Sequence, residues 1–73
     1  MTHDKVIELA REVAEVEGWL WLEPIRAIRF RRWWIIGPLR WEVVSNADRR
    51  GMNVHILIDD SSGRIIEKGF LSR

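Results

Sequence analysis

The chain has 73 residues and no cysteine, so a single small domain must be stabilised by burial of large side chains, without disulfides or thiolate metal sites. Its net charge is only +1, but residues 1–24 hold six acidic and two basic residues, whereas residues 25–50 hold seven arginines and two acidic residues. Because no apolar run approaches the roughly 20 residues of a membrane span and residues 1–5 do not begin a secretory signal, we expect a cytoplasmic protein.

The first predicted element is a helix over residues 3–17. Thr2 is a plausible N-cap residue, and Gly18 is placed as the C-terminal stop. Apolar residues recur at helical spacing at Val6, Leu9, Ala10, Val13, Val16 and Leu20. One side of this helix must therefore cover another layer of the fold.

Four strands are predicted to follow an irregular connector over residues 19–24. Their expected ranges are about 25–36, 39–45, 52–59 and 64–71, from alternating apolar and polar residues between turn formers. A β-bulge at Arg31-Arg32 would restore the phase of the alternation in the first strand. Gly37-Pro38 is predicted as the first turn, and residues 46–51 as the next loop.

The last two strands are predicted to form a hairpin around the sequence Asp-Asp-Ser-Ser-Gly at residues 59–63. Gly63 is expected to be left-handed in a three-residue loop that sets Asp60 opposite Arg64. In this register Ile58 faces Ile66, Ile56 faces Lys68 and Val54 faces Phe70, with Lys68 guarding the edge strand. The fold class is therefore α+β, one domain over residues 1–73 with an N-terminal helix packed on a four-stranded antiparallel meander.

The segment over residues 29–34 alternates arginine with aromatic residues, a combination that suits phosphate pairing and base stacking. The alternative is that the aromatic rings fill the core while arginine stems cover the sheet and pair with helix carboxylates. Neighbouring Trp33 and Trp34 point to opposite faces of a strand, so at least one should leave the core and mark a contact surface. The predicted partner-binding residues are Arg29, Arg31, Arg32, Trp33, Trp34, Arg49 and Arg50.

Catalytic and metal-binding patterns are missing from the sequence, so we expect no enzyme activity, no cofactor and no metal. His3 and His55 lack the neighbours that a zinc or iron site requires, and the Asp-Ser-Gly turn lacks the spacing of a calcium loop. His55 is expected to lie diagonal to Glu67 across the hairpin in a structural role. An enzyme using that pair would need a cleft over the same face.

The predicted hairpin resembles that of the PepSY domain family, which reads apolar-Asp-x-x-(Thr/Ser)-Gly-x-apolar and is matched by Asp59, Ser62 and Gly63. The resemblance implies a non-enzymatic binding or inhibitory module, usually extracytoplasmic, that acts on peptidases or regulates them. We expect a protein partner at the sheet face or edge, contacted by Trp33 or Trp34 with the neighbouring arginines. The alternative is a nucleic-acid-binding domain that adds Arg49 and Arg50, and homodimerisation is a further option.

Overall fold

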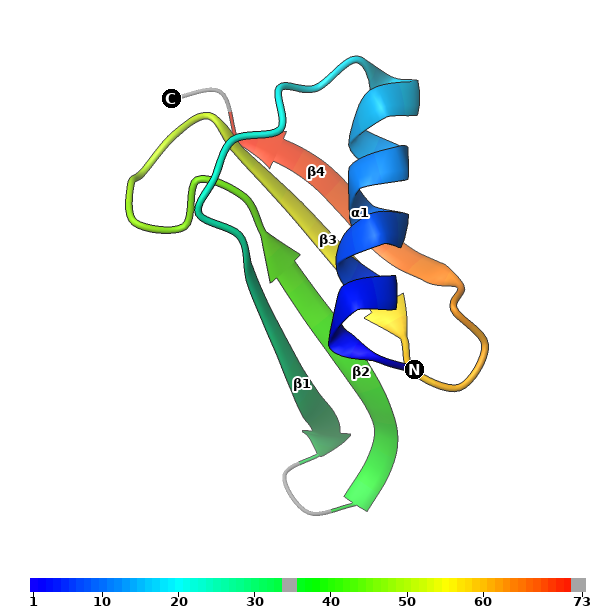
Figure 1. Cartoon of the computed structure of the whole chain (residues 1–73). Helices are drawn as coiled ribbons and strands as arrows, with labels where there is room; N and C mark the ends of the chain where they lie inside the picture. Colours follow the sequence, from blue (N-terminus) through cyan, green and yellow to red (C-terminus); the bar gives the residue numbers. More distant parts are fainter. Residues whose placement is uncertain (34–35, 72–73) are drawn as a thin grey trace.

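The computed structural model shows one helix and four strands. It describes residues 1–33 and 36–71, with the backbone alone for residues 32, 33 and 36. In chain order the elements are α1 (His3–Glu17), β1 (Arg26–Trp33), β2 (Ile36–Val44), β3 (Asn53–Asp59) and β4 (Ile65–Leu71). The strands form one antiparallel sheet in the order β1-β2-β3-β4, and α1 lies across one of its faces (Figure 1). The predicted α+β arrangement of a helix on a four-stranded meander is confirmed.

The helix α1 begins and ends where the sequence predicts. The Thr2 hydroxyl accepts a hydrogen bond from the Lys5 backbone N–H at 3.2 Å, which satisfies one of the free donors of the first turn. Gly18 ends the helix because its φ of 76° is left-handed, and its N–H turns back to carbonyls of the last turn.

The core lies between α1 and the two central strands. The fully or almost fully buried apolar side chains are Val6, Ala10 and Ala14 from the helix, with Trp41, Val43, Val54, Ile56 and Ile58 from β2 and β3. Two of the three helix residues are alanines, which let the helix backbone approach the sheet closely. The rest of the predicted apolar stripe is only partly covered, since Leu9 and Val13 are half-buried and Val16 is 84% exposed.

The β1–β2 hairpin confirms the predicted bulge but not the predicted turn. The pairing register shifts between Arg31 and Trp33, as expected for a bulge there. Trp33 then pairs with Ile36, so Gly37-Pro38 belongs to β2 and is not the turn. A proline is tolerated at this point because β1 bulges opposite it and β2 pairs with β3 only from Arg40 onward.

The β3–β4 hairpin keeps the predicted register away from its turn. Ile56 pairs with Lys68, and Val54 pairs with Phe70. Nearer the turn the register shifts by one residue, so Ile58 pairs with Ile65 and the predicted pairing with Ile66 is wrong. Ile65 consequently packs against the core on the helix side, whereas pairing of Ile58 with Ile66 would have set Ile65 on the opposite face.

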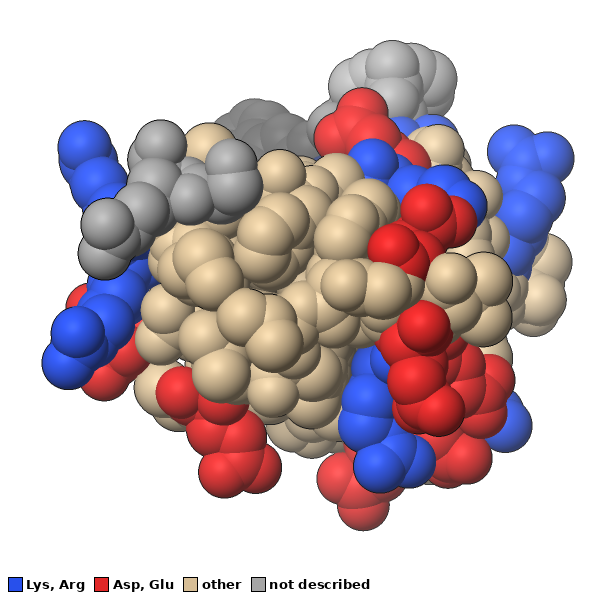
Figure 2. Space-filling view, turned by 90° about the horizontal axis from the view of Figure 1, so that it is seen from above, with Lys and Arg blue, Asp and Glu red and all other residues tan. Residues whose placement is uncertain are grey.

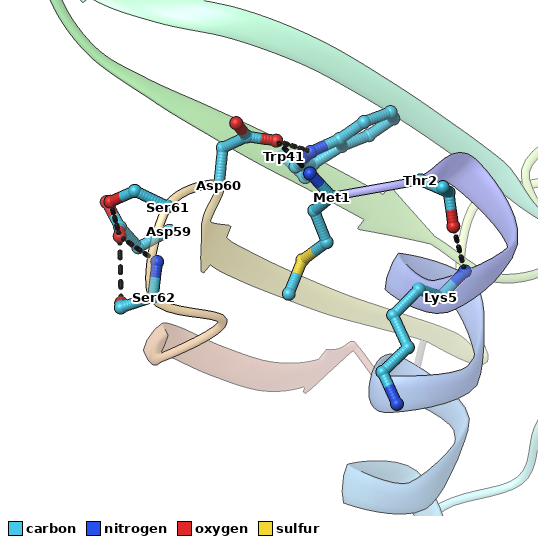
Figure 3. Close-up of polar contacts among 8 residues, drawn as sticks. All are labelled: Met1, Thr2, Lys5, Trp41, Asp59, Asp60, Ser61 and Ser62. Carbon is cyan, nitrogen blue, oxygen red and sulfur yellow. Dashed lines mark hydrogen bonds and ion pairs between the residues drawn. The ribbon is translucent and has the colours of Figure 1, made fainter.

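The turn itself explains this shift. The Asp59 N–H bonds to the Arg64 carbonyl at 2.9 Å, so Asp59 and not Asp60 lies opposite Arg64, and the loop has four residues. The Asp59 carboxylate accepts hydrogen bonds of 2.8–2.9 Å from the hydroxyls of Ser61 and Ser62 and from the Ser62 N–H (Figure 3). Gly63 is left-handed, with φ of 75°, as predicted.

The loop between β2 and β3 is built around the buried side chain of Asn53, a role that the sequence pattern did not predict. The Asn53 side chain is nearly buried, with 8% exposure, and its amide nitrogen donates to the carbonyls of Ser45, Asn46 and Arg49 at 2.7, 2.9 and 3.2 Å. Its amide oxygen accepts the Gly51 N–H at 2.7 Å. One side chain thus satisfies four backbone groups, which holds the loop in a defined shape.

Candidate functional site

A groove of about 290 Å³ lies between α1 and the edge strand β4. Its apolar lining comes from Leu9, Val13 and Val16 on the helix and from Ile65 on the strand. In the part of the chain that the structure describes, β4 pairs with β3 on one side only, so its outer backbone groups are free to bond. An apolar groove beside a free strand edge has the two features that bind an extended peptide segment.

The apolar surface continues from this groove towards the end of the helix. Trp19 stacks on Phe70, with ring centroids 6.1 Å apart and planes 17° from parallel. The neighbouring Leu20 is 54% exposed. Viewed from the end of the molecule where α1 stops, the centre of the surface is uncharged and acidic and basic side chains surround it (Figure 2).

The rim of the groove is charged. Lys68 Nζ lies 2.7 Å from the Glu17 carboxylate, so the lysine predicted to guard the edge strand is paired with the helix. Glu12 is a second acidic residue at the rim. The helix as a whole holds five acidic and two basic residues over His3–Glu17, so the potential on this side favours cations.

Trp41 is a packing residue at the other end of the helix. Its indole N–H donates to the Asp60 carboxylate at 2.6 Å, and the Met1 amino group lies 3.6 Å from the same oxygen (Figure 3). The His3 ring meets the indole edge-on at 6.1 Å, and the Arg29 guanidinium lies 5.9 Å from its centroid. These contacts fix the indole in the core and leave little of it for a ligand.

The predicted partner-binding residues are distributed over different parts of the molecule. Arg29 and Arg31 lie on the helix side of β1, because they pair with Trp41 and Leu39, and Arg31 also donates to the Gly37 carbonyl at 3.3 Å. Arg49 and Arg50 are exposed on the loop at the opposite end of the strand. Five residues of β1, roughly 16 Å, separate Arg31 from that end.

The remaining predicted binding residues cannot be placed in a surface. Arg32 and Trp33 belong to β1, where only their backbone is described, and Trp34 lies outside the described residues. The arginines of known position form no single patch. Their role in binding a protein or a nucleic acid therefore stays a prediction.

His55 lies diagonal to Glu67 as predicted, because Leu57 pairs with Glu67 and His55 with Gly69, but its hydrogen-bond partner is a different residue. Its Nε2 lies 3.0 Å from a carboxylate oxygen of Glu42 on β2, and Glu67 on β4 is not its partner. Glu42 and Glu67 both lie diagonal to His55, because both pair with Leu57. The His55 ring turns towards Glu42 on β2 and bonds to it. Both groups are more than a third exposed, which is typical of a surface hydrogen bond.

The sheet face opposite α1 is open and partly apolar. Ile28 and Phe30 on β1 are 46% and 37% exposed, and Val44 and Leu57 are half-buried on the same face. Arg40 lies between Phe30 and Asp59 in the pairing, and its Nε is buried with no hydrogen-bond partner among the described residues. A buried donor without a partner lowers stability.

Within residues 1–33 and 36–71, no group of three His, Asp or Glu side chains is arranged to hold a metal ion. None of the described helices has the length and apolarity to cross a bilayer. Comparisons with protein-family models, with curated proteins and with solved structures found no match.

Proposed function

We propose that this protein is a small non-enzymatic binding module that holds an extended segment of a partner protein along β4. The observation that carries the proposal is the apolar groove under α1 beside the free edge of that strand. A segment added there becomes a fifth strand about 4.8 Å beyond β4, and its backbone continues the hydrogen-bond ladder.

Side chains of the added strand enter the groove at alternate positions. Leu9, Val13 and Val16 line the helix side of the groove, and a strand added beside β4 would cover them. At about 290 Å³ the groove is at the lower end of small-molecule pockets, which suits a few aliphatic side chains better than a whole ligand. The resemblance to the PepSY family implies the same class of role.

The charge at the rim of the groove adds a preference for the charge of the partner segment. Glu12 and the acidic helix favour basic residues between the aliphatic positions, since opposite charges steer association and acidic segments are repelled. The proposed ligand is therefore an extended segment that alternates aliphatic with basic residues.

A peptide titration followed by NMR tests the proposal on the full chain labelled with ¹⁵N. The probe is a short blocked peptide that alternates valine with lysine, and we expect its binding to shift amide signals of β4 and α1. The same peptide with glutamate in place of lysine, and a version N-methylated on the edge that faces β4, should both fail to bind.

Two substitutions test the groove against matched controls. Val16→Asp should weaken binding by at least about tenfold, because it removes the burial of one aliphatic side chain, while Ile28→Asp on the other sheet face should have no effect. Glu12→Lys should reverse the preference between the lysine and glutamate peptides, and Glu15→Lys outside the groove should not. Binding that is insensitive to Val16→Asp and to N-methylation would refute the proposal.

A further inference from the structure

We infer that the open face of the sheet is an interface for a second copy of this chain, packed face to face about a two-fold axis parallel to the strands. The site is on the face opposite α1, so the inference does not depend on the proposed function of the groove. It starts from the exposed side chains of Ile28 and Phe30 on β1 and from the charged residues that the neighbouring strands place on the same face.

The pairing registers place the side chains of this face in rows across the sheet. The row nearest the β3–β4 turn contains Phe30, Arg40, Asp59 and Arg64. The middle row contains Ile28, Glu42, Leu57 and Glu67. Each row therefore combines an exposed or half-buried apolar residue with charges of one or both signs.

Two sheets can stack about a two-fold axis that is parallel or perpendicular to the strands, and the two arrangements differ in which charged side chains face each other. An axis parallel to the strands lays β1–β2 of one copy over β3–β4 of the other and keeps each row at its own level. Arg40 then lies above Asp59 of the second copy and Phe30 above Arg64, while the glutamates of the middle row lie above Leu57 and Ile28 and not above each other.

The other axis, perpendicular to the strands, is disfavoured. It lays each strand over its own copy and stacks the middle row on itself, which sets Glu42 against Glu42 and Glu67 against Glu67. Like charges held together at an interface suppress that arrangement. Aligned stacking of sheets about 10 Å apart is also the common geometry of β-sandwiches.

The size of the face sets the strength of the pairing. Four strands of about seven residues cover roughly 440 Å² per copy, or about 900 Å² in total, from standard strand dimensions. This is below the roughly 1,200–2,000 Å² of standard stable interfaces. The dimer should therefore dissociate on dilution, and it must be studied over a wide concentration range.

Sedimentation equilibrium of the full chain between low micromolar and millimolar concentration tests the interface. We expect the mass to rise from 8.7 kDa towards twice that value. Phe30→Asp and Ile28→Asp should each keep the chain monomeric over this range, with unchanged circular dichroism because both side chains are exposed. Val16→Asp on the other face should dimerise like the unmodified chain.

Cross-linking determines the axis, and the chain has no cysteine of its own to interfere. With a bis-maleimide matched to a sheet separation of about 10 Å, Leu57→Cys should cross-link to its copy whichever axis applies. Val44→Cys should do so only about the parallel axis, because the other axis moves the two residues apart along the strands.

Three results would overturn the inference: a monomer at millimolar concentration, a dimer that survives both aspartate substitutions, or Leu57→Cys cross-linking without Val44→Cys cross-linking. None of these results bears on peptide binding in the groove. A dimer abolished by Val16→Asp would instead place the contact between copies on the groove and refute the open-face interface.

Discussion

Replacing Asn53 by alanine should remove a large part of the stability of this protein. The side chain makes four hydrogen bonds with the backbone of residues 45–51 and is 8% exposed. At a net contribution of about 0.5–1.5 kcal/mol for each bond, the expected loss is about 2–6 kcal/mol. A chain of this length has only roughly 4–11 kcal/mol in total.

Urea unfolding followed by tryptophan fluorescence measures this loss. Asn53→Ala should lower the midpoint without changing the denaturant slope, because the buried area is almost the same. Asn53→Asp should be still less stable, since it retains an acceptor for the Gly51 N–H but directs a carboxylate at three carbonyls. Asp48→Ala, on the exposed part of the same loop, is the control. A loss below about 0.5 kcal/mol for Asn53→Ala, or an Asn53→Asp variant as stable as the unmodified chain, would refute the reasoning.

Three further changes test other contacts. Gly63→Ala and Gly18→Ala should each lower the melting temperature by a similar amount, because both positions have positive φ and the Cβ added at Gly63 would meet only the flexible end of the Met1 side chain, at 2.8 Å; a melting temperature unchanged at either position would contradict the role of the left-handed backbone. The Ser62 hydroxyl and N–H lower the pKa of Asp59 below its ordinary value of 3.8, so its contribution to stability is complete above that value and is lost as the pH falls through the lowered pKa. Asp59→Asn should therefore flatten the acid side of the curve of stability against pH, and an unchanged acid limb would argue against it. Trp41→Phe removes an indole N–H bonded to a carboxylate at 2.6 Å and should cost about 2 kcal/mol in urea unfolding, whereas an unchanged midpoint would show that the bond contributes little.

Periodicity and local turn chemistry were sufficient to predict most of this fold. Thr2 and Gly18 bound the helix because capping is a local property, and the bulge after Arg31 follows from a change of phase in the sequence. The register at Ile56 follows from the alternation of apolar residues. Such features depend on residues close together in the chain.

The predictions that were wrong concern features that depend on contacts between residues distant in the sequence. Asp60 bonds to the Trp41 indole, which is nineteen positions away, and this contact leaves Asp59 to close the hairpin. Gly37-Pro38 has a common turn composition, but the hairpin closes before it because Trp33 pairs with Ile36. The carboxylates of Glu42 and Glu67 both lie within reach of His55, and the sequence does not specify which of them it binds.

The groove was not predicted, although the sequence held a signal for it. The predicted apolar stripe of the helix ran as far as Val16 and Leu20, farther than the strands cover. The excess of apolar length on the helix could have indicated a surface awaiting a partner. Which side of the helix the sheet would leave uncovered depends on how α1 crosses the strands, which a single sequence does not specify.

The helix covers only one side of the sheet, and this has a consequence for valency. If two copies join through their bare sides, both grooves face outwards at opposite ends of the pair. A target that displays two suitable segments on one chain could then occupy both at once, and its avidity could exceed that of a single segment by about 10²–10⁴ when the linker spans the distance.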